Sequence, residues 1–315
     1  MKASERVAAL ESLLRRHDYE VIADWTGGNY CFDVIANSEK RRGLVLRLAE
    51  NAEKCSRQTI RELKKLALTL DGLPLLISDR IGKRELEVGI FYKRHGLFVL
   101  NERTFDYVIS NEEVPFVYAD KGGLYVKLNS EKLKKARVER GLSLGELAQR
   151  IGVTRRTIYE YERGNMDATF EVAIRLEEVL DADVVESAGR AIRELRVDVE
   201  RESGASGDEA IASICRVLER AGFETWIFRK TPFDIAAKKT PRSNLIIKSV
   251  RKGVDKEEIS LMSEIAEVMR ARALIVVRKR PAPRVLGEGD RIDVVDEKSL
   301  ERVCESLAGS RSLDN

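Results

Sequence analysis

The first third of the chain alternates between helical and strand patterns of hydrophobic residues. Residues 4–16 and 56–70 carry apolar side chains at helical spacing. The apolar run at 73–78 is nearly continuous, which is typical of a strand covered on both faces. Together these patterns predict an α/β domain over residues 1–110. Its other elements are expected to be strands at 19–23, 31–36, 44–48, 87–92 and 97–100 and a short helix at 101–109.

The middle of the chain changes to a mainly helical pattern. Residues 111–129 are expected to form a hairpin connector, because Gly122-Gly123 separates two apolar runs and no Gly-Lys-Ser/Thr follows to make a phosphate loop. Residues 130–196 then predict an all-α domain of five short helices, the first of which ends at Gly141.

The last third repeats the pattern of the first. Residues 197–208 are charged and rich in Gly and Ser, which is typical of a linker. Residues 209–308 then form a second predicted α/β domain, followed by a tail at 309–315. An Asp and a basic residue are separated by the same 14 positions in both domains, Asp33 to Arg47 and Asp234 to Lys248. We therefore expect two copies of one α/β fold on either side of the helical domain.

The stretch from Ser143 to Asn165 has the layout of two short helices joined by a tight turn. Ser143 is a candidate N-cap, and Glu146 lies at the spacing of a capping box. Gly152 supplies the turn, since it has no Cβ. The inward-facing residues are predicted to be Leu147, Ala148, Ile151, Ile158 and Tyr161. This is the helix-turn-helix layout, in which the second helix enters the major groove of DNA.

The same stretch resembles the Cro/C1 (xenobiotic-response-element type) helix-turn-helix family. The matching residues are Glu146, Leu147, Ala148, Gly152, Val153, Thr154, Ile158, Tyr161, Glu162 and Gly164. Leu144 departs from the pattern, because many members carry a phosphate-contacting Gln there. The resemblance implies a lambda-repressor-like domain in which a partly buried salt bridge joins Arg137 to Glu162.

The second helix, residues 154–163, supplies the candidate DNA contacts. Arg155 and Arg156 can each bond guanine in bidentate fashion or lie along phosphate, and Glu160 can accept from a cytosine amino group. The bland alternative is that the two arginines are merely solvated. By the resemblance, the backbone-contacting positions are Ser143, Thr154, Arg163 and Asn165.

Each α/β copy resembles the restriction-endonuclease-like (PD-(D/E)xK) fold. In active members, the Asp and a carboxylate two residues before the Lys hold a divalent metal, and the Lys orients the attacking water. Here the second acid position is Val45 in one copy and Ile246 in the other. Too few hard ligands then remain for Mg²⁺. The nuclease positions Asp33, Arg47, Asp234 and Lys248 are therefore interpreted as vestigial, with no metal and no cofactor.

A carboxylate elsewhere in the chain could still replace the missing ligand. The candidates are Glu20, Glu224 and a helix residue such as Glu257.

Composition limits the other possibilities. The net charge is only +3, so affinity for DNA must come from a local basic patch. The apolar runs are too short for a membrane helix and the N-terminus is not a secretory signal, which favours a cytoplasmic protein. The four cysteines form no C-x-x-C pair and there are two histidines, so buried apolar thiols are favoured over a zinc site.

The favoured function is a sequence-specific regulator of transcription that binds double-stranded DNA and is not an enzyme. The whole arrangement resembles the archaeal helix-turn-helix transcriptional regulators. A homodimer is expected, because one helix-turn-helix covers only a short site. The alternative is a metal-dependent endonuclease or resolvase that the helix-turn-helix targets to DNA. A third option is a toxin–antitoxin or other partner-binding module that represses its own promoter.

Overall fold

The computed structural model describes residues 3–24, 30–110, 114–195, 208–239, 244–250, 255–277, 292–297 and 299–303. Nearly all of the predicted linker at 197–208 and the whole tail at 309–315 lie outside these residues. The chain divides into two compact units. Unit 1 takes residues 1–48, 56–74 and 197–315, and unit 2 takes residues 49–55 and 75–196. This division differs from the domain limits expected from the sequence, since residues 1–110 contribute to both units.

The first α/β copy supplies two helices and the edge of a sheet to unit 1. They are α1 (Ala3–Arg16), β1 (Glu20–Ala23), β2 (Val34–Asn37), the start of β3 (Leu44–Asn51) and α2 (Arg57–Thr69). Strands β1, β2 and β3 pair antiparallel in that order. Ser56 caps α2 through a bond from the Thr59 amide to its hydroxyl. All five elements fall close to their predicted positions.

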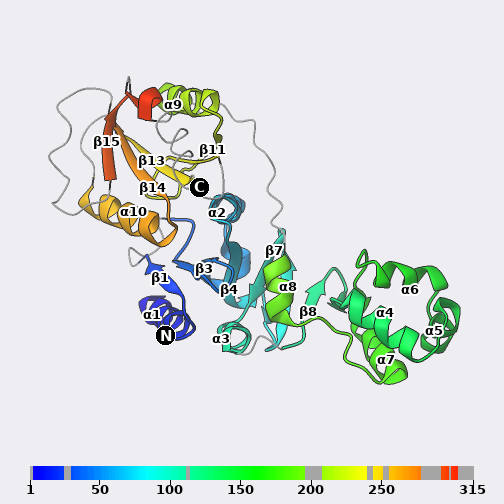
Figure 1. Ribbon diagram of the computed structural model, residues 1–315. Helices are drawn as coiled ribbons and strands as arrows, with labels where there is room; N and C mark the ends of the chain where they lie inside the picture. The colour runs from blue at the N-terminus through cyan, green and yellow to red at the C-terminus, as the bar shows by residue number, and fades with distance from the viewer. Residues whose placement is uncertain are drawn as a thin grey trace. The chain divides into compact units, whose positions relative to one another are not determined.

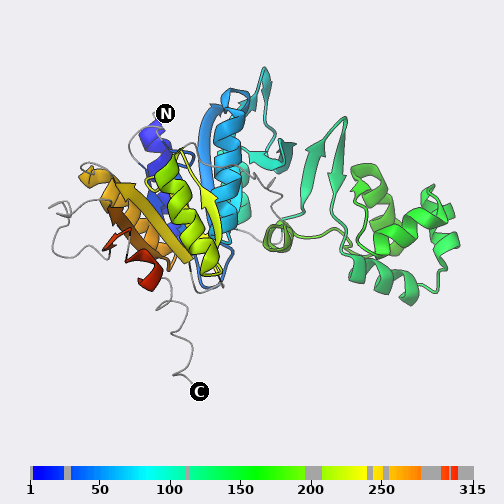
Figure 2. The same cartoon turned by 90° about the horizontal axis from the view of Figure 1, so that it is seen from above.

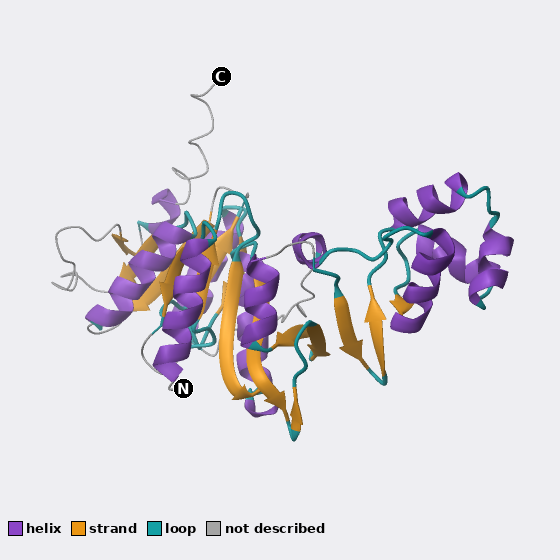
Figure 3. Cartoon of the chain, turned by 90° about the horizontal axis from the view of Figure 1, so that it is seen from below, coloured by secondary structure: helices purple, strands orange, loops and turns teal. Residues whose placement is uncertain are grey.

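The second copy builds a complete five-stranded sheet in unit 1 (Figures 1 and 3). Its order is β11-β12-β13-β14-β15; the first three strands are antiparallel and the last two pairings are parallel. Ile235, Ile247 and Leu274 pack toward one helix, α9, while α10 contacts β14. The elements are α9 (Glu209–Arg220), β11 (Glu224–Ile227), β12 (Ile235–Lys238), β13 (Asn244–Val250), α10 (Lys256–Val268), β14 (Arg272–Val277) and β15 (Ile292–Asp296).

The predicted repeat is confirmed by the strand register. Glu20 pairs with Asn37 at one end of β1 and β2, and Glu224 pairs with Lys238 at the equivalent end of β11 and β12. The helices that follow also end alike, since Asp71 after α2 and Arg270 after α10 both have left-handed backbones, with φ of 52° and 49°. The same α-β-β-β-α order is therefore built twice.

Within unit 1 the two copies pack reciprocally. Helix α2 of the first copy contacts β12 of the second, and α10 of the second contacts β1 and β2 of the first. The bonds at the helix ends match: Asn37 donates to the Val268 carbonyl over 2.8 Å, and Lys238, at the equivalent strand position, pairs with Asp71. Exchange of equivalent contacts is the pattern of an internal two-fold relation.

Unit 2 contains a sheet ordered β4-β7-β6-β8-β9-β10, with β5 paired to β4. Strand β6 begins at Ile90 rather than at the predicted residue 87, because Gly89 has a φ of +86° that no strand accommodates. Five aromatic rings pack together in this sheet, on Phe91, Phe98, Phe116, Tyr118 and Tyr125. The elements are β4 (Leu73–Ile81), β5 (Arg84–Glu85), β6 (Ile90–Arg94), β7 (Leu97–Leu100), α3 (Glu102–Ser110), β8 (Val117–Asp120) and β9 (Gly123–Val126). A short 3-10 turn, η1 (Ala52–Lys54), also belongs to this unit.

Four helices of unit 2 form a separate bundle, drawn in green in Figure 1. Their buried core includes Leu147, Ile158 and Leu176 and extends to Val126 and Leu128 of the predicted connector. The connector is therefore part of the bundle's support, since β9 also pairs with the short β10. Figure 2 shows the two strands of the connector next to the green helices. The elements are α4 (Ser130–Glu139), α5 (Leu144–Ile151), α6 (Arg155–Glu162), β10 (Ala168–Thr169) and α7 (Phe170–Leu180).

The predicted fifth helix lies elsewhere in unit 2. It is α8 (Ala188–Glu194), and it packs against α3 instead of joining the core of the bundle. Bridges from Pro115 to Ser187 and from Leu128 to Val185 direct the chain away from the bundle before α8 begins. The expectation of five helices in one all-α core was wrong in this respect.

The cysteines behave mainly as small apolar residues. Cys31 and Cys215 are buried, and Cys55 is half-buried. Burial raises the pKa of Cys215 to about 11, so it is a poor nucleophile at neutral pH. Cys304 lies outside the described residues. Among the described helices, none combines the length and the apolar composition that crossing a bilayer requires.

Candidate nucleic-acid interface

The predicted capping box fixes the start of α5. The Glu146 amide donates to the Ser143 hydroxyl over 3.1 Å, and the Ser143 amide donates to the Glu146 carboxylate over 2.8 Å. The latter bond lowers the pKa of Glu146, which keeps the cap ionised. Gly152 ends the helix in the left-handed region with a φ of 76°. The capping box and the glycine turn are thus confirmed.

The inward faces of α5 and α6 hold the two helices at a fixed angle. Leu147, Ala148 and Ile151 of α5 are buried against Ile158 and Tyr161 of α6. Complete burial of such side chains is worth roughly 1.5–3 kcal/mol each. The outward face of α6 is therefore carried on a rigid support.

An ion pair joins α4 to α6 beneath that face. Arg137 Nη2 lies 3.0 Å from Glu162 Oε2, and its Nη1 donates to the Leu142 carbonyl over 2.8 Å. The two side chains are only 12% and 8% exposed. The Glu162 carboxylate is therefore occupied by its ion pair with Arg137 and is not available to contact DNA bases.

The outward face of α6 is basic and aromatic. At 100° per residue, Arg156, Tyr159 and Arg163 fall on the side opposite to the buried Ile158 and Tyr161, and Arg155 lies at the flank of that side. All four residues are exposed. Thr154 begins the helix, and its hydroxyl accepts from the Thr157 amide over 3.1 Å. The structure therefore brings the predicted arginines together on one face and uses the hydroxyls of Ser143 and Thr154 as helix caps.

Two predicted contact residues are bonded to each other. Asn165 Nδ2 donates to Glu160 Oε2 over 2.8 Å, and the Asn165 amide donates to the Glu160 carbonyl. The sequence treated them as independent, one reading a base and the other touching the backbone. Either role would require the side-chain bond to open or to be shared.

Sequence reasoning overlooked Tyr159. Its hydroxyl accepts from Arg163 Nη1 over 2.9 Å, and the guanidinium carbon lies 5.5 Å from the ring centroid. This hydrogen bond raises the pKa of Arg163, which stays charged. The available signal was its position four residues after Arg155, on the same helical face.

The aspartate and the cation at the predicted nuclease positions have the same arrangement in both copies. Asp33 accepts from the Leu48 amide over 2.6 Å and lies 3.1 Å from Arg47. Asp234 accepts from the Ser249 amide over 2.8 Å and lies 3.7 Å from Lys248. Burial is the main cause that raises the pKa of each aspartate, against the opposing effect of the adjacent cation. Both aspartates thus fasten β2 or β12 to the next strand.

The donor set does not fit a divalent cation. Val45 and Ile246, at the second acid position, are buried and apolar. Within the described residues, no group of three or more His, Cys, Asp or Glu side chains is arranged to hold a metal ion. Glu20 and Glu224 cannot substitute, because the register places them at the opposite ends of β1 and β11 from Asp33 and Asp234.

A carboxylate that the sequence did not name, Glu258, lies beside Lys248 in the second copy. Glu258 Oε2, on α10, lies 3.3 Å from Lys248 Nζ, so Lys248 contacts both Glu258 and Asp234. The sequence named Glu257, one residue earlier. Successive side chains of an α-helix point 100° apart, so Glu258, and not Glu257, contacts Lys248.

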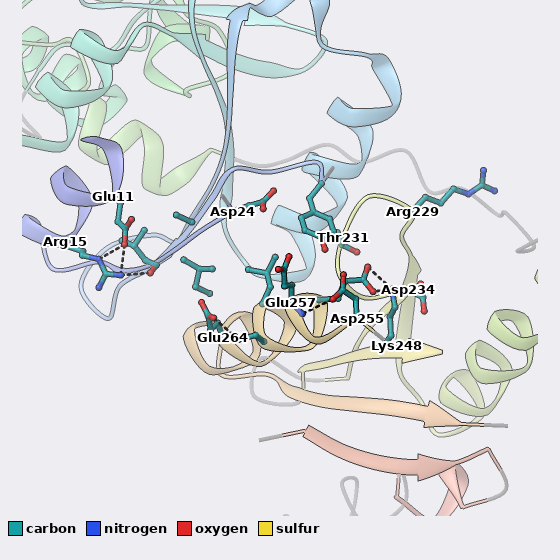
Figure 4. A pocket seen from close by; sticks show the side chains of 17 residues that line it. Glu11, Arg15, Asp24, Arg229, Thr231, Asp234, Lys248, Asp255, Glu257 and Glu264 are labelled. Carbon is teal, nitrogen blue, oxygen red and sulfur yellow. Dashed lines mark hydrogen bonds and ion pairs between the residues drawn. The ribbon is translucent and has the colours of Figure 1, made fainter. Parts of the chain in front are cut away.

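Asp234, Lys248 and Glu258 line a cleft of about 1090 Å³ in unit 1 (Figure 4). Its charged lining comprises Glu11, Asp24, Asp234, Asp255, Glu257, Glu258 and Glu264 against Arg15, Arg229 and Lys248. Burial first and then the Glu258 charge raise the pKa of Tyr30, at its edge, to about 12. An acidic surface repels the phosphate backbone. The basic face of α6 is therefore better suited to DNA than this cleft.

Comparison with known families identifies both parts. A PD-(D/E)XK superfamily domain matches residues 4–115 and 207–306, and a helix-turn-helix domain matches residues 133–186. The chain therefore belongs to the PD-(D/E)XK superfamily, with a helix-turn-helix domain between its two superfamily segments.

Its relatives share most of their length with it. A protein of Thermoplasma volcanium named "Putative HTH-type transcriptional regulatory protein TV0294" is 31% identical over 271 residues, covering 86% of this chain and 85% of the relative. The protein of Methanocaldococcus jannaschii with the same description, MJ1164, is 31% identical over 301 residues, covering 94% and 91%. One from Thermococcus kodakarensis, TK0539, is 28% identical over 307 residues, covering 96% and 93%. The similarity thus spans both superfamily segments and the helix-turn-helix.

Proposed function

We propose that this protein is a sequence-specific transcriptional regulator that binds double-stranded DNA through the major groove with α6. The observation that carries the proposal is the basic outer face of α6, held rigid by the capping box and by the Arg137–Glu162 pair. Archaeal relatives named as helix-turn-helix transcriptional regulators support it. The superfamily segments then serve as scaffold, since their acid positions are incomplete.

The contacts divide into two kinds. Arg155 and Arg156 stand at the first turn of α6, the part of a recognition helix that meets base edges, and Glu160 follows one turn later. Ser143 and Thr154 lie at the N-termini of α5 and α6, where backbone amides and the helix dipole favour phosphate. Arg163 and Asn165, at the other end of α6, complete the backbone contacts.

Replacing Arg155 or Arg156 with alanine tests this function. Each substitution is expected to cost about 1–3 kcal/mol on the preferred site and to relax selection at one base position, because a bidentate contact to a base is lost. The measurement is selection from randomised DNA followed by titration of the selected sites. Arg216→Ala, which removes an exposed arginine from α9, is the matched control and should leave both readouts unchanged. Wild-type protein that selects no sequence would disprove the proposed function.

We further propose that two copies assemble through α7. Phe170 and Ile174 are 39% and 41% exposed and lie one turn apart on this helix. Glu171 and Arg175 lie beside them with the same spacing. An antiparallel pair of α7 helices places Phe170 against Ile174 of the other copy and Glu171 near its Arg175. The exposed strip is therefore complementary to itself, as a two-fold interface requires.

Ile174→Glu is expected to convert the dimer to a monomer, because a carboxylate would be buried at the centre of the interface. Sedimentation velocity at micromolar concentration, with and without selected DNA, measures this. Val138→Glu is the control, since Val138 is an exposed apolar residue on a different helix of the same bundle. A wild-type protein that sediments as a monomer under both conditions would contradict the proposal.

The alternative function is a metal-dependent endonuclease or resolvase. Membership of the PD-(D/E)XK superfamily and the approach of Glu258 to Lys248 beside Asp234 favour it, since the approach places two carboxylates and a lysine together. Two carboxylates fall short of the oxygen ligands that Mg²⁺ sites usually collect from protein, substrate and water. Binding without cleavage is therefore the function that we propose.

Incubation with duplex and branched DNA in Mg²⁺ or Mn²⁺ tests the alternative directly. We expect no cleavage by the wild-type protein above the level of the Asp234→Asn variant, since the missing acid is not replaced. Cleavage that is abolished by both Asp234→Asn and Glu258→Gln would instead establish a nuclease. Asn keeps an acceptor for the Ser249 amide, so the variant preserves the strand contact.

A further inference from the structure

Tyr159 has a position on α6 that the proposed contacts leave unexplained. It is 45% exposed, although a tyrosine ring of this size usually finds cover on a folded surface. It stands between Arg155 and Arg163 along the outward face of the helix, one turn from each. A helix that enters the major groove with this face carries Tyr159 into the groove with it.

The hydrogen bonding of the hydroxyl points outward from the protein. A tyrosine hydroxyl has one proton to donate and lone pairs that accept. Arg163 Nη1 occupies the acceptor side over 2.9 Å, because a guanidinium can only donate. In the part of the chain that the structure describes, the Tyr159 hydroxyl makes no other hydrogen bond. Its own proton is thus free for an acceptor on a bound molecule.

We propose that Tyr159 is a base-contacting residue that recognises thymine, an inference that rests on the proposed DNA-binding function. Thymine presents the O4 acceptor next to the C5 methyl group in the major groove. The Tyr159 hydroxyl donates to O4, and the edge of its ring packs on the methyl group. Cytosine presents an amino donor at the equivalent place and no methyl, and purines present acceptors without an apolar group.

Arg163 acts here as a positioning residue. Its guanidinium stacks over the Tyr159 ring and bonds the hydroxyl, which restricts the rotation of both side chains before DNA arrives. Side chains ordered in advance lose less entropy on binding. The remaining N–H groups of Arg163 are left to contact a phosphate.

The test compares Tyr159→Phe and Tyr159→Ala with the wild-type protein in selection from randomised DNA. The wild-type protein should select thymine at one position that does not depend on Arg155 or Arg156. Tyr159→Phe should reduce that preference about 3- to 10-fold, the effect of one hydrogen bond, and Tyr159→Ala should abolish it. Tyr107→Ala, an exposed tyrosine of α3, is the matched control and should change nothing.

A second arm removes the methyl group from the DNA. Replacing the selected thymine with deoxyuridine should weaken wild-type binding severalfold and leave Tyr159→Ala binding unchanged. Equal weakening of all sequences by Tyr159→Ala would show a backbone contact, and unchanged selection would show no contact; each result overturns the inference while the proposed function stands. A wild-type protein without any sequence selection would instead overturn the proposed function itself.

Discussion

Replacing Arg137 with alanine is expected to lower the free energy of unfolding of the helix-turn-helix bundle by about 3–5 kcal/mol. The reason is burial. Glu162 is 8% exposed, and without Arg137 its charge would remain in the bundle with no cation beside it. The Leu142 carbonyl would also lose its donor. Loss of DNA binding by this variant would then follow from unfolding of the support beneath α6.

Chemical denaturation followed by two probes measures the effect. Trp226 belongs to unit 1, and the sequence of unit 2 contains no tryptophan, so tryptophan fluorescence does not report unit 2, whereas circular dichroism reports all the helices. Arg137→Ala should shift part of the circular-dichroism transition to a lower denaturant concentration. The transition followed by tryptophan fluorescence should stay unchanged. The double variant Arg137→Met, Glu162→Leu should regain most of the stability, because no buried charge remains. A loss under about 1 kcal/mol, typical of exposed pairs, would contradict the prediction.

The local parts of the fold were predictable because their signals are local. The cap at Ser143, the turn at Gly152 and the inward stripe from Leu147 to Ile158 are each set by residues within a few positions of one another. The strands near Asp33 and Asp234 were also found, because the two copies support each other's interpretation. Short-range chemistry and internal repetition together gave both the helix-turn-helix and the α/β copies.

The long-range parts were not predictable from spacing. Nothing in the order of residues indicates that α2 packs on β12 or that α10 packs on β1 and β2. The path of α8 to α3 likewise depends on bridges between segments that are distant in the sequence. Hydrophobic periodicity shows which face of an element is buried, but it does not identify the partner that covers it.

The candidate site shows the same division. The arginines of α6 followed from the motif, whereas the Glu160–Asn165 and Tyr159–Arg163 bonds depend on side-chain rotamers that no spacing rule fixes. The sequence offered Glu20, Glu224 and Glu257 as replacement carboxylates, whereas the glutamate that contacts Lys248 is Glu258, one residue further along α10. A one-residue error is tolerable for a helix boundary and decisive for a side-chain contact.

The charges of the two surfaces agree with the proposed function, which is binding of DNA without cleavage. The outer face of α6 carries three arginines, while the cleft beside Asp234 carries seven carboxylates against three cations. A nuclease needs a metal to overcome such repulsion of phosphate. Under the proposed function, the same carboxylates repel the phosphate backbone and leave α6 as the attractive surface.

Replacing Glu62 with alanine is expected to destabilise unit 1 by about 3–5 kcal/mol, because Glu62 anchors α2 to the second copy. Glu62 is 5% exposed, lies 2.9 Å from Lys65 Nζ, and accepts from the Arg229 amide over 2.9 Å. Lys65 in turn lies 4.8 Å from the centroid of the Phe228 ring. The substitution would leave the half-buried Lys65 ammonium and the Arg229 amide without this acceptor.

Tryptophan fluorescence during denaturation measures this loss, since Trp226 belongs to unit 1 and the sequence of unit 2 contains no tryptophan. Glu62→Gln should cost less than alanine, because the amide oxygen still accepts from Arg229. Glu11→Ala is the matched control; it breaks an exposed helical pair with Arg15 and should cost under about 1 kcal/mol. Equal effects of Glu62→Ala and Glu11→Ala would show that the contact between α2 and the second copy does not stabilise the unit. Selective loss with Glu62→Ala would instead show that the two degenerate copies fold as one cooperative body.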